Sequence, residues 1–273
     1  MAKFANLVNQ EVFTQGTKMK KILLALGISV LIPAYAGQTA EQVLTISKIS
    51  TAAKQAQMTP KQALHRLKEG NERFVTNTLQ KRDYLAQAKQ ASYGQFPWAV
   101  VLNCMDSRSV PELFFDQGLA DLFILRVAGN ILNDDILGSM EFATKAVGSR
   151  LIVVLGHTSC GAMAGACQNV RLGHLDHVLD KIQPVVDSSK KTAKTDNCEE
   201  AVLIDEIAKN NALQVATQIQ QQSPIIRDLI AKGQVGIVAG IHDIKTGKVV
   251  FFEEGRLLPD VTESPATQSP TTK

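Results

Sequence analysis

Two stretches of sequence decide the fold: WAVVLNCMDSR at residues 98–108 and LIVVLGHTSCG at residues 151–161. Each opens with an unbroken apolar run, which is typical of a strand buried on both faces of a parallel sheet. Each then changes at once to cysteine, histidine or charged side chains. Because the carboxyl ends of parallel strands meet along one edge of a sheet, we predict that the two polar segments lie next to each other.

Other predicted elements surround these two strands. Further strands are predicted at 122–125, at 235–241 and, at an edge of the sheet, at 248–253. Helices are predicted to begin at Pro60 and to cover about 83–92, 136–147, 159–168, 199–221 and 224–231. The alternation of strands and helices predicts an α/β fold: a mostly parallel central sheet of four strands plus an edge strand, helices on both faces and an N-terminal helical arm.

The amino-terminal region has the pattern of a bacterial secretory signal. A pair of lysines at 20–21 precedes an apolar run at 22–32 that is too short to span a bilayer, and small residues at 34 and 36 form a cleavage site. We therefore predict that residues 1–36 are a signal peptide region, with Met19 as the expected true start. The alternative is a helix buried in the mature fold.

Cleavage before Gly37 would place the protein in the periplasm or outside the cell, with no membrane anchor left. The remaining chain is predicted to comprise an N-terminal arm at 37–58 that packs on a partner subunit, one α/β domain at 59–259 and a disordered tail at 260–273. Four lysines and one glutamate in residues 1–36 account for the whole net charge of +3, so the rest of the chain is formally neutral. This charge balance does not indicate nucleic acid as a partner.

The polar segments contain two thiols and one imidazole, from Cys104, His157 and Cys160. This is the ligand set of a catalytic zinc site with its fourth position open, and soft thiolates favour zinc over magnesium or calcium. Asp106 and Arg108 are predicted to form an ion pair that keeps the carboxylate ionised and fixed in direction. A disulfide between the two cysteines is the alternative in an exported protein, but it leaves the histidine and the ion pair unexplained.

The paired motifs Cys104-x-Asp106-x-Arg108 and His157-x-x-Cys160-Gly161 resemble those of the β-class carbonic anhydrases. The resemblance extends from about Lys61 to Glu254 and includes motifs at 70–74, 95–97, 115–118 and 126–130. Either paired motif alone would be weak evidence, whereas the two together are specific to that family.

The resemblance implies a carbonic anhydrase, a zinc-dependent lyase that interconverts carbon dioxide and bicarbonate. It implies one Zn²⁺ per chain on Cys104, His157 and Cys160, with Asp106 as a further ligand in a closed, inactive state. It also implies that Asp106 and Arg108 are catalytic: Asp106 would orient the attacking water, and Arg108 would hold Asp106.

The resemblance further implies that Gln95, Phe123 and Gly161 bind substrate and that the chain forms a homodimer or a higher even oligomer. Two other functions would use the same metal-binding residues. One is hydrolysis of carbonyl sulfide or carbon disulfide on the same fold. The other is a non-catalytic periplasmic protein that binds zinc or exchanges thiols, although the lack of a Cys-x-x-Cys motif disfavours thiol exchange.

The chain departs from the family pattern in a few places. Val101 stands where some members have a tryptophan of a bicarbonate regulatory site, and Phe142 stands where others have a pocket tyrosine. Asn103 is more polar than the glycine or alanine that is common there. Cys167 and Cys198 are either two buried apolar side chains or a disulfide, and the sequence does not decide between them.

Overall fold

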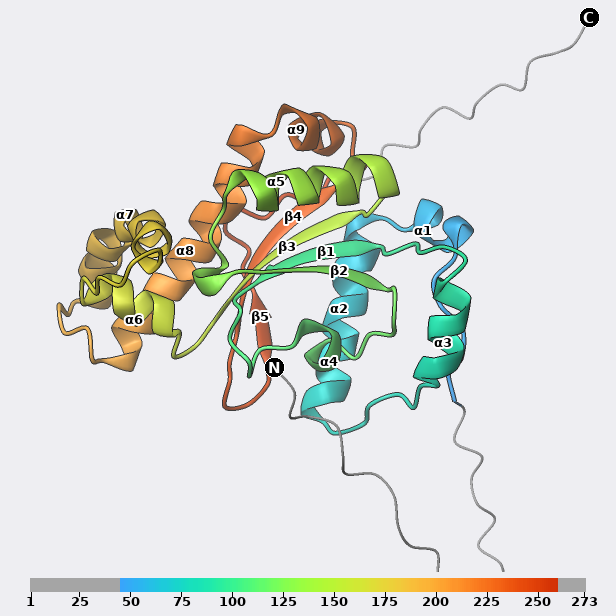
Figure 1. Cartoon of the computed structure of the whole chain (residues 1–273), viewed down its shortest axis with the longest axis horizontal. Helices are drawn as coiled ribbons and strands as arrows, with labels where there is room; N and C mark the ends of the chain where they lie inside the picture. Colours follow the sequence, from blue (N-terminus) through green and yellow to red (C-terminus); the bar gives the residue numbers. More distant parts are fainter. Residues whose placement is uncertain (1–44, 260–273) are drawn as a thin grey trace, which may run out of the picture. The chain divides into compact units, whose positions relative to one another are not determined.

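A five-stranded sheet forms the scaffold of the fold (Figure 1). Its strands lie in the order β2 (Leu122–Arg126), β1 (Ala99–Asn103), β3 (Leu151–His157), β4 (Gly236–His242) and β5 (Val249–Phe251). The first four are parallel, and β5 runs antiparallel to β4. The predicted sheet of four strands plus an edge strand is therefore confirmed.

The computed structural model describes residues 45–259, which belong to one compact unit spanning Val43–Lys273. The predicted signal peptide region at 1–36 and the predicted tail at 260–273 lie outside the described residues. Within residues 45–259, no helix is both long and apolar enough to cross a bilayer.

The described part of the predicted arm contacts its own chain. The backbone amide of Ile46 donates to the carbonyl of Lys81 at 2.9 Å. Helix α1 (Ala52–Gln57) follows, and its Gln55 side chain donates to the carbonyl of Pro97 at 2.8 Å. The first contact joins the arm to the segment before α3 (Tyr84–Ala91), and the second joins α1 to the segment before β1.

Side chains of the sheet alternate between two faces, and each face is covered by helices. Helices α5 (Asp134–Glu141), α8 (Ala201–Gln222) and α9 (Pro224–Ala231) pack on the face that carries Leu102 and Val154. Helices α2 (Pro60–Val75) and α4 (Pro111–Phe114) pack on the opposite face. Every residue of β1 and β3 is buried, which explains the unbroken apolar runs.

The helix boundaries follow local signals in several places. Thr59 caps α2, because its side chain accepts from the Gln62 amide at 3.1 Å while Gln62 Oε1 accepts from the Thr59 amide at 2.9 Å. The predicted helix at 136–147 is α5 followed directly by one turn of π-helix, η2 (Phe142–Val147). The other elements are α3 (Tyr84–Ala91), the short η1 (Ala128–Asn130), α6 (Gly161–Cys167) and α7 (Leu175–Ala193).

A third apolar cluster lies at the carboxyl ends of β1 and β3, where α6, α7 and α8 pack together. It contains both Cys104 and Cys160. The site predicted from sequence is therefore built into a packed part of the molecule.

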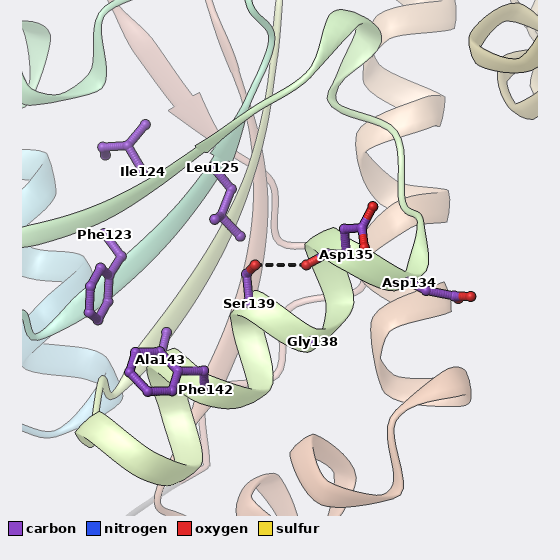
Figure 2. Close-up of a pocket in the computed structure, with 9 residues that line it drawn as sticks. All are labelled: Phe123, Ile124, Leu125, Asp134, Asp135, Gly138, Ser139, Phe142 and Ala143. Carbon is purple, nitrogen blue, oxygen red and sulfur yellow. Dashed lines mark hydrogen bonds between the residues drawn. The ribbon is translucent and has the colours of Figure 1, made fainter.

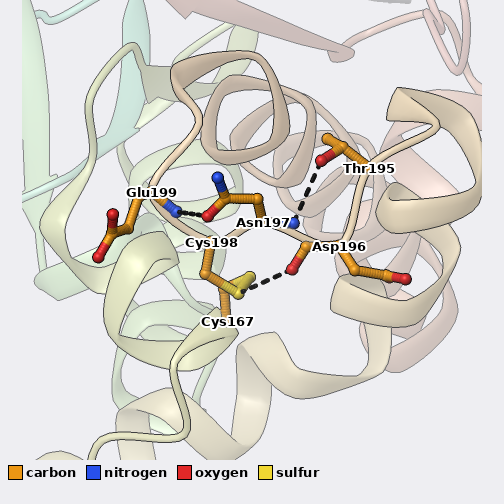
Figure 3. The surroundings of a disulfide bond; sticks show 6 residues. All are labelled: Cys167, Thr195, Asp196, Asn197, Cys198 and Glu199. Carbon is orange, nitrogen blue, oxygen red and sulfur yellow. Dashed lines mark hydrogen bonds between the residues drawn. A yellow bond between two sulfur atoms is a disulfide. The ribbon is translucent and has the colours of Figure 1, made fainter.

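A disulfide joins Cys167 to Cys198, with their Cα atoms 5.6 Å apart (Figure 3). The bond connects the end of α6 to the segment between α7 and α8 and encloses α7. Of the two alternatives left open by the sequence, the disulfide is the one present.

We expect the disulfide to stabilise the fold chiefly by restricting the unfolded chain. A loop of 31 residues corresponds to about 4 kcal/mol of unfolding free energy. The double variant Cys167→Ala, Cys198→Ala should lose about this amount in chemical denaturation, and a reductant should produce a similar loss only in the unaltered chain. Equal stability of the unaltered chain with and without reductant would contradict this expectation.

Candidate metal centre

Three side chains meet at the carboxyl edge of the sheet: Cys104, His157 and Cys160. Their ligand atoms all lie within 4.8 Å of one another, and all three residues are buried. Cys104 follows the last residue of β1, His157 is the last residue of β3, and Cys160 directly precedes α6. The structure thus brings together the three residues that the sequence assigned to zinc.

The parallel register explains this meeting. Leu102 is opposite Val154, and Asn103 is opposite Leu155, so β1 and β3 end at neighbouring positions of the same edge. The chain leaves β3 through a tight turn in which Ser159 has a φ of 54°. This left-handed conformation is costly for a residue other than glycine, and it brings Cys160 back toward the histidine.

His157 presents an unpaired nitrogen to the two sulfurs. Its Nδ1 lies 2.9 Å from the carbonyl oxygen of Thr158. Because a carbonyl only accepts, Nδ1 carries the proton in the neutral ring and Nε2 exposes its lone pair. Nε2 is buried and has no hydrogen-bond partner in the described part of the chain. A buried lone pair beside two sulfurs fits a tetrahedral zinc site.

The electrostatics of the group also favour a cation. A hydrogen bond from Cys160 lowers the pKa of Cys104 to about 4, and the same contact raises the pKa of Cys160. Burial lowers the pKa of His157, but its contacts with Cys104 and with the Thr158 carbonyl raise it more. A metal ion that binds both sulfurs as thiolates would release their protons.

Asp106 and Arg108 form a two-point ion pair beside this group. Arg108 Nε donates to Asp106 Oδ1 at 2.9 Å, and Arg108 Nη2 donates to Oδ2 at 2.7 Å. The hydrogen bond from the guanidinium holds the pKa of Asp106 well below its usual range. Asp106 Oδ2 also lies 3.9 Å from Nε2 of His157. An ionised carboxylate of fixed direction therefore stands at the edge of the candidate metal position.

Arg126 and Gly129, which the sequence placed only in a family motif, support the Cys104 loop. Arg126 donates to the carbonyl of Cys104 at 3.2 Å and to that of Asp106 at 2.6 Å. The Gly129 amide donates to Cys104 Sγ at 3.4 Å. A Cβ at Gly129, whose φ is 67°, would come within 2.7 Å of Ile182. The sequence signal that could have revealed both roles is their position, Arg126 as the last residue of β2 and Gly129 shortly after it.

Asp205 on α8 is a further neighbour that sequence reasoning missed. Its carboxylate accepts a hydrogen bond from the Ser159 amide at 2.8 Å, in the strained turn before Cys160. On the other side of that turn, Arg108 Nη2 reaches the Ser159 carbonyl at 3.5 Å. Burial raises the pKa of Asp205. No local sequence pattern connects Asp205 with a turn 46 residues earlier in the chain.

A family model described as carbonic anhydrase matches residues 99–249, which include all the groups described above. Carbonic anhydrase 2 of Mycobacterium tuberculosis is 34% identical over 198 residues, or 70% of this chain and 92% of the relative. The chain belongs to the β-class carbonic anhydrases.

Solved structures agree with this assignment. The structure of the β-carbonic anhydrase CcaA has a TM-score of 0.55 and 28% identity, covering 72% of this chain and 92% of that one. A second match has a TM-score of 0.57 at 24% identity, over 61% of this chain and 85% of the other, and supports the fold. It comes from work on two tetrameric β-carbonic anhydrases of Sordaria macrospora. The chain is therefore an enzyme that acts on carbon dioxide.

The three residues that the β-carbonic anhydrase pattern assigned to substrate lie in different places. Phe123 lines a cavity of about 530 Å³ between the edge strand β2 and α5, opposite Phe142 (Figure 2). Their ring centroids are 6.4 Å apart, and Phe142 is 57% exposed. Gly161 is exposed at the first position of α6, and Gln95 is exposed in the segment before β1. The metal-binding group is not part of this cavity's lining.

Proposed function

We propose that this carbonic anhydrase binds one zinc ion through Cys104, His157 and Cys160 and uses it to interconvert carbon dioxide and bicarbonate. The observation that carries the proposal is the buried Nε2 of His157, which has no hydrogen-bond partner in the described part of the chain and belongs to a group whose ligand atoms lie within 4.8 Å of one another. When bound there, zinc would supply a nucleophile from water at neutral pH, because it lowers the pKa of water from about 15.7 toward 7.

Asp106 is proposed to accept a hydrogen bond from the reacting water and so to fix the direction of its lone pair. The carboxylate suits this task because it is ionised and faces His157. Both of its oxygens also bind Arg108, which offers a partner that competes with the metal for them. Direct ligation of zinc by Asp106 in a closed state would require this ion pair to open.

The substrate can be tested directly. We expect the zinc-loaded chain to hydrate carbon dioxide in stopped-flow assays and to turn over carbonyl sulfide and carbon disulfide far more slowly. Family membership favours carbon dioxide over the two sulfur-containing analogues. Faster turnover of either analogue in the same preparation would assign the hydrolase function instead.

We also propose that the enzyme assembles as a homodimer or a higher even oligomer. Strand β2 lies at the edge of the sheet, and the cavity next to it exposes Phe142. The similar enzymes of Sordaria macrospora are tetrameric. Light scattering coupled to gel filtration measures the mass in solution, and a monomer at micromolar concentration would count against the proposal.

Export from a bacterial cytoplasm is a further proposal. It is supported by the signal-like pattern of residues 1–36 and by the disulfide between Cys167 and Cys198, since such bonds persist in oxidising compartments. Mass spectrometry of chain recovered from the cell envelope should find a mature form that begins at Gly37. Recovery of the full-length chain from the cytoplasm would contradict this.

A further inference from the structure

The loop that carries Cys104, Asp106 and Arg108 is closed at its base by a fully buried polar network. Asn103 precedes the loop and Ser109 follows it, and both residues are 0% exposed. Asn103 Nδ2 donates to the Ser109 carbonyl at 2.9 Å and to Ser109 Oγ at 3.1 Å. The two ends of the loop are therefore held together by one side chain.

His242 extends this network to the other half of the site. Its Nδ1 and Ser109 Oγ share a hydrogen bond of 3.2 Å, and its ring stacks on Phe114 with centroids 4.2 Å apart. The backbone carbonyl of His242 accepts from the Thr158 amide at 3.0 Å. His242 thus contacts the loop after β1 through its side chain and the turn after β3 through its backbone.

The burial of these groups makes the network costly to disturb. His242 is 3% exposed, and burial lowers its pKa to about 4, which keeps the ring neutral at neutral pH. Buried polar groups contribute to a single defined geometry only when their hydrogen bonds are made. None of the three side chains belongs to the metal-binding group. Their hydrogen bonds join the two ends of the loop after β1 and connect that loop to His242.

We infer that Asn103, Ser109 and His242 are positioning residues that hold the Asp106–Arg108 pair at its distance from the Cys104, His157 and Cys160 group. This inference rests on the proposed function and adds residues to it. The network acts through Asp106, whose backbone carbonyl accepts from the Ser109 amide at 3.0 Å. It also gives a physical account of Asn103, the polar residue that departs from the family pattern.

The test uses Ser109→Ala, which removes one hydroxyl and leaves the metal-binding group intact. We expect one zinc per chain to be retained and the rate constant kcat for carbon dioxide hydration to fall about 10-fold or more, since small displacements of catalytic groups are costly. The matched control is Ser149→Ala. Ser149 is also 0% exposed and donates to the Pro97 carbonyl at 2.8 Å. It lies just before the first residue of β3, whereas the metal-binding group lies at the last. The loss of the Ser149 hydroxyl should lower the melting temperature without lowering kcat.

A double-mutant cycle separates positioning from general destabilisation. In an Asp106→Asn background, Ser109→Ala should change kcat less than about 2-fold, because its effect passes through the carboxylate already removed. If Ser109→Ala folds poorly, His242→Phe takes its place in the test. This variant keeps a ring on Phe114 but lacks Nδ1, and the same loss of kcat with zinc retained is expected. An equal fold-loss in both backgrounds, or a near-normal kcat in both single variants, would overturn the inference. Because the unaltered enzyme is assayed alongside, that outcome would leave the proposed function standing.

Discussion

Replacing Cys160 with serine is expected to remove most of the zinc and to reduce carbon dioxide hydration to the uncatalysed background. A serine hydroxyl is a harder and much weaker zinc ligand than a thiolate, and Cys160 supplies one of only two sulfurs in the group. The measurements are zinc per chain by elemental analysis and stopped-flow hydration on the same sample.

The matched control for this change is the pair Cys167→Ser, Cys198→Ser. It makes the same chemical substitution at the disulfide, away from the ligand group. This control should keep one zinc per chain and near-normal turnover at a temperature where it remains folded. If Cys160→Ser behaved like the control, Cys160 would not be a zinc ligand.

The second large effect is expected at the ion pair. Arg108→Lys should retain zinc but lose about 10²- to 10³-fold in kcat, the usual loss when a preorganised polar contact is removed. Lysine offers a point charge in place of the two-point contact of 2.9 and 2.7 Å, so Asp106 would be free to turn toward the metal. Asp106→Asn should also retain zinc and keep only a small, measurable part of its kcat, because an amide is a poorer acceptor than a carboxylate.

Arg171→Lys provides the control for the ion-pair variants. Arg171 pairs with Asp180 at 2.6 Å, and both side chains are more than half exposed. Exposed pairs contribute little, so zinc content and kcat should stay unchanged in this variant. Near-normal turnover in Arg108→Lys would reduce Asp106 and Arg108 to a structural ion pair.

Much of the fold was predictable because the sheet has strong local signals. The apolar runs of β1 and β3 marked buried parallel strands, and Thr59-Pro60 marked the start of α2. Helix α7 was not predicted, since Pro184 interrupts its sequence and lysines crowd its end. The helix does have an apolar stripe of Leu179, Ile182 and Val186. These side chains pack against α8, a tertiary contact that the local sequence does not show.

The candidate site also has a part that the sequence predicts and a part that it does not. Cys104, His157 and Cys160 were predictable because short motifs at the ends of adjacent strands bring them together. Contacts from distant parts of the chain were not predictable. Ser109 and His242, which share a hydrogen bond, are 133 residues apart. The disulfide requires the Cα atoms of Cys167 and Cys198 to lie close together, and the number of residues between them does not reveal that distance.

The most direct test of the account is to remove the metal from the unaltered enzyme and to return it. Zinc per chain and carbon dioxide hydration would be measured in the enzyme as isolated, after chelation, and after addition of one equivalent of Zn²⁺. We predict one zinc per chain at the start, loss of hydration in step with the metal, and recovery with the single equivalent. Full hydration by a chain free of zinc would contradict the account.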